Sequence, residues 1–141
     1  MKVEDICNLP VNEISEKNCI LFIWVTYPML KEGLKVIESW GFKYKTIAFQ
    51  WIKLNKKNNN YFFGLGRWTR GNSECCLIGI KGKINRLSNK VFQLVVTPIE
   101  KHSKKPDIVR NRIIDLVGDL PRIELFARQS ADGWDCWGDE V

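Results

Sequence analysis

Three polar segments in the second half of the chain combine residue types and spacings that could do chemistry. The first, residues 101–107, reads Lys-His-Ser-Lys-Lys-Pro-Asp and comes just before a predicted helix. Cations at this end of a helix oppose its dipole unless an anion binds there. The segment therefore indicates either a site for a carboxylate or phosphate group or a basic turn exposed to solvent.

The other two segments each follow or contain a short apolar stretch near the C-terminus. Residues 124–128 read as an apolar strand that ends in Arg128, and ligands of open α/β sheets bind beyond the carboxyl ends of strands. Residues 133–141 hold the adjacent carboxylates Asp139 and Glu140, which could accept hydrogen bonds from a ribose diol. An exposed arginine and a solvated acidic terminus are the alternatives to these two readings.

Several kinds of active site find no support in the sequence. The chain has one histidine, His102, and no arrangement typical of a Ser-His-Asp hydrolase. Its five cysteines include no Cys-x-x-Cys pair, so we expect no metal site and reduced thiols, as in the cytoplasm. We identify no catalytic residue from these patterns.

The composition is that of an α/β domain with a basic surface. The chain has 141 residues, 45% of them hydrophobic, and 22 Lys and Arg against 16 Asp and Glu give a net charge of +6. This excess favours a polyanionic partner. No apolar run approaches the roughly 20 residues that a membrane span needs, so we expect no membrane association.

Apolar runs and helical spacing predict alternating strands and helices, and hence a mixed sheet covered by helices. The predicted helices are 28–40 and 106–117, and the predicted strands are 20–26, 42–54, 74–80, 91–97 and 122–127. We expect residues 1–141 to form a single domain.

Nine short motifs occur in an order that carries further information. They are residues 9–11, 21–26, 40–44, 51–53, 66–70, 74–77, 102–107, 124–128 and 137–141. Together they resemble the family of MT-A seventy-kilodalton-subunit-like adenine methyltransferases over nearly the whole chain. The resemblance implies a Rossmann-like methyltransferase fold with a mixed, mostly parallel sheet. It also implies transfer of a methyl group from S-adenosylmethionine to the exocyclic amino group of adenine in DNA or RNA.

The resemblance also implies roles for particular residues. Those expected to bind the cofactor S-adenosylmethionine are Lys105, Arg128, Ser130, Ala131, Asp139 and Glu140. Those expected to approach the target adenine in the nucleic acid are Trp68, Arg70, Asn72 and Glu74. Members of the family often have Asn where this chain has Asp139, and either side chain can accept a hydrogen bond from a hydroxyl.

The family's catalytic signature, Asp-Pro-Pro-Trp, does not occur in these 141 residues, because none of the five prolines is adjacent to another. We therefore expect a sheet that lacks one N-terminal strand, with an unpaired edge at residues 20–26 that promotes self-association. The alternative function is that of a non-catalytic, nucleic-acid-binding subunit that partners an intact methyltransferase.

Overall fold

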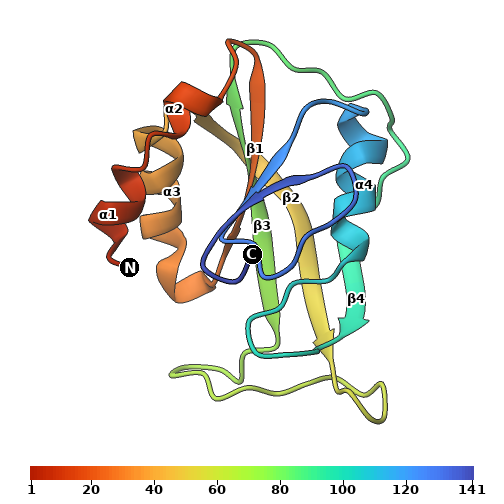
Figure 1. The fold of residues 1–141 in the computed structure, drawn as a ribbon. Helices are drawn as coiled ribbons and strands as arrows, with labels where there is room; N and C mark the ends of the chain where they lie inside the picture. The colour runs from red at the N-terminus through yellow and green to blue at the C-terminus, as the bar shows by residue number, and fades with distance from the viewer. The chain divides into compact units, whose positions relative to one another are not determined.

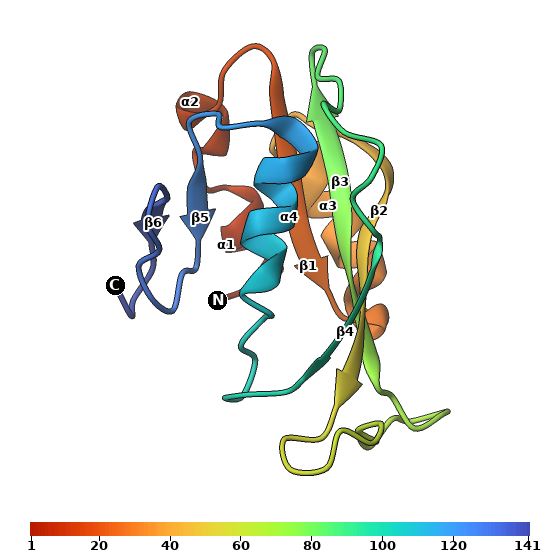
Figure 2. The same ribbon diagram turned by 90° about the vertical axis from the view of Figure 1, so that its right-hand side faces the viewer.

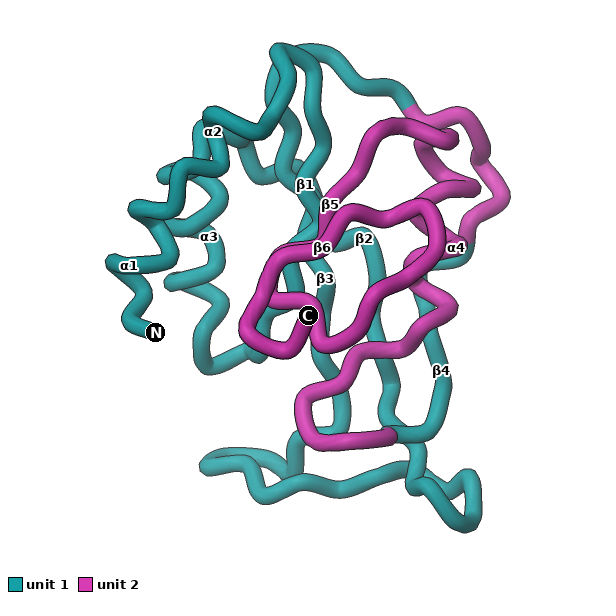
Figure 3. Tube along the Cα trace, viewed as in Figure 1, with its two compact units in different colours: residues 1–85, 92–99 teal, residues 86–91, 100–141 magenta.

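The computed structural model describes all 141 residues, which form two compact units (Figure 3). Unit 1 comprises residues 1–85 and 92–99, and unit 2 comprises residues 86–91 and 100–141. The residues expected at the target adenine lie in unit 1, and those expected at the cofactor lie in unit 2. The single methyltransferase-like domain over residues 1–141 stays a prediction.

Unit 1 is built on a four-stranded sheet in the order β1-β3-β2-β4 (Figure 1). Its strands are β1 (Cys19–Val25), β2 (Lys43–Leu54), β3 (Ser73–Lys81) and β4 (Leu94–Pro98). β3 runs antiparallel to both of its neighbours, whereas β2 and β4 are parallel. β1 is an outer strand that pairs only with β3, as expected for an unpaired edge at residues 20–26.

Helices of unit 1 connect and cover this sheet. They are α1 (Val3–Cys7), α2 (Val11–Ile14), the 3-10 turn η1 (Tyr27–Met29) and α3 (Leu30–Ser39). α3 carries the chain from β1 to β2 and lies along one face of the sheet (Figure 2). Its Ile37 packs closely because Gly79 on β3 has no side chain; a β-carbon there would lie 3.0 Å from the Ile37 methyl group. The Trp40 indole N–H donates to the Ile6 carbonyl at 2.8 Å and so ties α1 to the end of α3.

Unit 2 contains the helix α4 (Ile108–Val117) and a parallel pair of short strands, β5 (Ile123–Leu125) and β6 (Asp135–Trp137). Gly118 ends α4 with a φ of 94°, a left-handed conformation that favours glycine. The Leu87 amide donates to the Leu116 carbonyl at 2.7 Å, which holds the basic segment 86–91 against the last turn of the helix.

The predicted mixed sheet is confirmed, but its pairings correct the expectation of a mostly parallel sheet. Two of the three pairings in the four-stranded sheet are antiparallel, because β2 returns directly into β3 through the excursion 55–72 instead of through a helical crossover. All seven predicted helices and strands form with shifted ends; α1, α2 and β6 were not predicted. No helix is both long enough and apolar enough to cross a bilayer.

Candidate functional site

In unit 2, the two parallel strands bring the expected cofactor residues to one place. Leu125 at the end of β5 lies opposite Trp137 at the end of β6. Arg128 and Glu140 each follow three residues later, so both emerge at the same carboxyl edge. The Ala127 amide donates to the Trp137 carbonyl at 3.0 Å and extends the pairing beyond the strands.

The backbone at this edge has an unusual conformation and a close approach between two turns. Phe126 has a φ of 58°, which is unusual for a residue other than glycine and tends to mark functional turns. Its ring packs edge-on against the Trp137 ring, with centroids 5.3 Å apart. A β-carbon at Gly138 would lie 2.9 Å from the backbone of Ala127, so only glycine lets the two turns approach this closely.

Arg128 connects all three polar segments singled out in the sequence. Its Nε donates to Glu140 Oε2 at 3.2 Å, and its Nη1 donates to the His102 carbonyl oxygen. Both side chains stay partly open to solvent, with 38% of Arg128 and 56% of Glu140 exposed. A charged ligand could therefore reach either group without unfolding the turn.

The other expected cofactor residues lie on the same turns. Ser130 Oγ lies 3.7 Å from the Cys136 thiol on β6. The Ala131 carbonyl accepts from the Trp134 amide at 3.1 Å, which closes the loop between β5 and β6. Asp139 is exposed next to Glu140, and Lys105 is half-buried in the turn before α4. No group of three or more His, Cys, Asp or Glu side chains is arranged to hold a metal ion.

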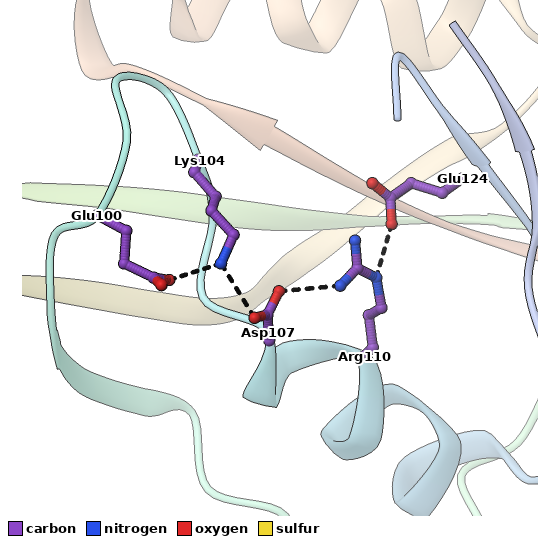
Figure 4. Close-up of polar contacts among 5 residues, drawn as sticks. All are labelled: Glu100, Lys104, Asp107, Arg110 and Glu124. Carbon is purple, nitrogen blue, oxygen red and sulfur yellow. Dashed lines mark hydrogen bonds and ion pairs between the residues drawn. The ribbon is translucent and has the colours of Figure 1, made fainter. Parts of the chain in front are cut away.

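A chain of ion pairs orders the turn that carries Lys105 (Figure 4). Lys104 Nζ contacts Glu100 Oε2 at 2.7 Å and Asp107 Oδ2 at 3.0 Å. Arg110 continues the chain from Asp107, at 3.0 Å, to Glu124 on β5, at 2.8 Å. The basic turn thus supplies its own anions at the start of α4, so Lys104 is already neutralised there by carboxylates of the protein.

Sequence reasoning missed this network. The spacings of three and four residues between its first four members were a usable signal, because such pairs meet in turns and helices. The contact of Arg110 with Glu124 spans 14 residues and had no local signal.

The network shifts the pKa values of its members. The Glu100 and Asp107 carboxylates, by hydrogen bonding, raise the pKa of Lys104 above its usual value. The hydrogen bond from Lys104 lowers the pKa of the Asp107 carboxyl. The hydrogen bond to Glu124 raises the pKa of Arg110. Each shift favours the charged form of its group, so the network stabilises the ionised forms of Lys104, Asp107 and Arg110.

We expect the network's contribution to stability to disappear in acid. Asp107 has a lowered pKa, so its contribution is present above its unfolded pKa and is lost as the pH falls through the folded pKa. The raised pKa of Lys104 causes the opposite loss only in strong alkali. Asp107→Asn should therefore lower the free energy of unfolding by about 0.5–1 kcal/mol at pH 7, and the gap should be smaller at pH 3.

Urea unfolding at both pH values measures this gap. Asp115→Asn is the control, because Asp115 is an acid of α4, the helix that Asp107 caps, and lies outside the network. A difference in unfolding free energy between wild type and Asp107→Asn that is equal at pH 3 and pH 7 would contradict the stabilising role of the Asp107 carboxylate in the network.

In unit 1, the residues expected at the target adenine divide between the root and the tip of the excursion 55–72. Figure 1 shows this segment reaching beyond the ends of β2 and β3. At the root, the Asn72 carbonyl accepts from the Lys53 amide at 2.9 Å. Glu74 is the buried acidic residue of the core, and its Oε1 lies 2.7 Å from Lys53 Nζ.

The tip of the excursion exposes aromatic and basic side chains together. Trp68 is 98% exposed. The Arg70 guanidinium lies 5.4 Å from the centre of the Phe63 ring, in a cation–π contact. Exposed aromatic rings beside cations suit stacking with bases and contact with phosphates. The structure therefore does not gather the four residues into one cluster: Asn72 and Glu74 line the root, and Trp68 and Arg70 the tip.

Comparison with known proteins agrees with the resemblance drawn from the motifs. The MT-A70 family model matches residues 1–140. The type II methyltransferase M.MunI of Mycoplasma sp is 38% identical over 143 residues, which cover 100% of this chain and 58% of that protein. The N(6)-adenosine-methyltransferase MT-A70-like protein of Arabidopsis thaliana is 29% identical over 125 residues.

The human N(6)-adenosine-methyltransferase catalytic subunit METTL3 is 28% identical over 123 residues, covering 86% of this chain and 20% of the human protein. The Arabidopsis match covers 86% of this chain and 18% of its relative. The chain thus spans from about a fifth to somewhat over half of the length of these relatives.

Proposed function

The chain belongs to the MT-A70 family, and on that premise we propose that it is part of an adenine methyltransferase. The proposed enzyme uses S-adenosylmethionine and methylates the exocyclic amino group of adenine in DNA or RNA. We also propose that residues 1–141 form one Rossmann-like domain. The parallel pair β5-β6 and the passage from β1 through α3 to the parallel strand β2 support that fold.

One observation carries the cofactor assignment: Arg128 joins the basic turn to Glu140 at the carboxyl edge of β5 and β6. This edge is where α/β sheets bind nucleotides. The residues there fit S-adenosylmethionine, because carboxylates accept from ribose hydroxyls and cations attract the cofactor's carboxylate. We propose that Asp139 and Glu140 hold the ribose, and that Lys105, Arg128, Ser130 and Ala131 line the rest of the site.

The cofactor, when bound, supplies a methyl group made electrophilic by its sulfonium. The exocyclic nitrogen of adenine is a poor nucleophile, so the protein's contribution is to hold that nitrogen in line with the methyl group and exclude water. Trp68 and Arg70 stack on the nucleic acid and contact its phosphates, and Asn72 and Glu74 accept hydrogen bonds from the target nucleotide.

Two measurements on the full-length protein test this proposal. Calorimetric titration with S-adenosylmethionine should detect one site, and an assay with a tritium-labelled cofactor should place the label on the N6 position of adenine in DNA or RNA. Absence of cofactor binding would contradict the proposal.

One sequence observation favours a second candidate function, since these 141 residues contain no Asp-Pro-Pro-Trp motif. The candidate is a non-catalytic, nucleic-acid-binding subunit that assembles with an intact methyltransferase or with itself. Binding of nucleic acid without methyl transfer, restored by adding an intact methyltransferase subunit, would support it over the first. For both candidates we propose a cytoplasmic location, on the cysteine pattern of the sequence.

A further inference from the structure

Lys53, the last lysine of β2, forms the base of the excursion 55–72. Its backbone amide donates to the Asn72 carbonyl at 2.9 Å, on the returning limb. Its backbone carbonyl accepts from the Phe62 amide at 2.9 Å, on the outgoing limb. Both limbs of the loop that carries Trp68 and Arg70 are thus attached to one residue.

The side chain of Lys53 forms an ion pair with Glu74. Its Nζ lies 2.7 Å from Glu74 Oε1 and 5.2 Å from the centre of the Trp51 ring. Only 20% of the lysine side chain and 10% of the glutamate side chain are exposed. A pair covered to this degree is costly to break, because loss of one partner leaves the other charge buried and uncompensated.

Glu74 is also fixed at its backbone from the neighbouring strand. The Gln50 side-chain amide donates to the Glu74 carbonyl at 3.4 Å, and Gln50 Oε1 accepts from the Tyr27 hydroxyl at 2.7 Å. Glu74, the second residue of β3, is therefore held both at its carboxylate and at its backbone carbonyl. A carboxylate accepts hydrogen bonds through two oxygens, and fixing its position limits the directions from which donors can reach it.

We propose that Lys53 is a positioning residue for the target nucleotide. It fixes the Glu74 carboxylate as an acceptor for an amino or hydroxyl group of a nucleoside, and it couples that acceptor to the loop that holds the nucleic acid. This inference rests on the proposed function, because it assigns Glu74 to the nucleotide that is methylated.

An ion pair that only stabilises the fold would show the same contacts. The test must therefore separate an effect on the position of the Glu74 carboxylate from an effect on the stability of the protein. The variants, made in the full-length protein, are Lys53→Met, Lys53→Arg and the charge swap Lys53→Glu with Glu74→Lys. Lys45→Met is the matched control, because Lys45 is an exposed lysine on the same strand. Each protein is measured for kcat and KM with a nucleic-acid substrate, Kd for S-adenosylmethionine and thermal midpoint.

We expect Lys53→Met to lower kcat/KM by roughly 10- to 100-fold, since displacement of a positioned group by about 1 Å has effects of this size. Its Kd for S-adenosylmethionine should stay within about twofold of wild type, because the cofactor residues belong to unit 2. Lys53→Arg should recover most of the activity. The charge swap should recover the thermal midpoint but not kcat/KM, because it places an ammonium where the acceptor stood.

Three results would overturn the inference: wild-type kcat/KM in Lys53→Met, full activity in the charge swap, or losses that follow the thermal midpoint across all variants. If Lys53→Met does not fold, the activities of Lys53→Arg and of the charge swap decide whether Lys53 positions Glu74.

A further variant, Glu74→Gln, separates the positioning role of Lys53 from the proposed role of Glu74 at the nucleotide. Impaired Glu74→Gln with normal Lys53→Met refutes only the positioning role, whereas a wild-type protein without methyl transfer refutes the proposed enzyme and the inference with it.

Discussion

Arg128→Met is expected to weaken binding of S-adenosylmethionine by roughly 100-fold, because hydrogen bonds of charged groups contribute about 1.5–3 kcal/mol each. Arg128 donates to both Glu140 and the His102 carbonyl, so its loss separates the acidic pair from the basic turn. Methionine keeps the unbranched apolar stem and removes only the guanidinium. Calorimetric titration of the full-length protein with S-adenosylmethionine measures the change in Kd.

Arg122→Met is the matched control for this experiment. Arg122 belongs to the same unit and also makes an ion pair, at 2.6 Å with Asp119, but it precedes β5 where Arg128 follows it. The control should bind S-adenosylmethionine within about threefold of wild type, because the Arg122 guanidinium donates to Asp119 and to the Leu120 carbonyl, both of which precede β5. Equal Kd values for the two variants would show that the carboxyl edge of β5 and β6 is not the cofactor site.

The strands and helices of this chain were largely predictable because its apolar patterns are strong. Residues 20–26 form a continuous apolar run, and β1 (Cys19–Val25) covers almost the same residues. Helix α4 was predictable from its apolar spacing and from Gly118 at its end. β6 escaped prediction because three residues, Asp135–Trp137, are too few to show an alternating pattern.

Strand direction was not predictable from local patterns alone. A strand buried on both faces suggests a parallel sheet, yet β3 lies between β1 and β2 and opposes both. That order depends on where the excursion 55–72 returns the chain, which is a long-range property.

The candidate sites show the same limit. The motifs identified Arg128 and Glu140, but the pairing of Arg128 with Glu140 spans 12 residues and that of Lys53 with Glu74 spans 21. No local pattern links such residues, so only the fold reveals which charges already have partners. Within the basic turn 101–107, Lys104 is paired with two acids, Glu100 and Asp107.

The excursion 55–72 offers a test of nucleic-acid binding that removes no side chain. A β-carbon added at Gly66 would overlap the carbonyl oxygen of Thr69 and lie 3.2 Å from the Gly71 nitrogen. Gly66→Ala must therefore open the turn that presents Trp68 and Arg70. Gly71→Ala is the matched control, because a β-carbon there meets nothing within 4 Å.

We expect Gly66→Ala to weaken nucleic-acid binding by roughly tenfold or more, since stacking of one base on an aromatic ring contributes about 1–3 kcal/mol. The slope of log K against log salt should become shallower by about 0.7–0.9 for each phosphate that the displaced arginines no longer reach. Fluorescence anisotropy of a labelled oligonucleotide across a series of KCl concentrations gives both quantities. The thermal midpoint should hardly move, because the tip is exposed and packs little apolar surface.

Two outcomes would contradict this prediction. If both alanine variants bind nucleic acid like wild type, the geometry of this turn has no part in binding. If both variants bind equally weakly, the added methyl group explains the defect and the conformation of the turn does not. Only a defect confined to Gly66→Ala ties nucleic-acid affinity to the conformation that presents Trp68.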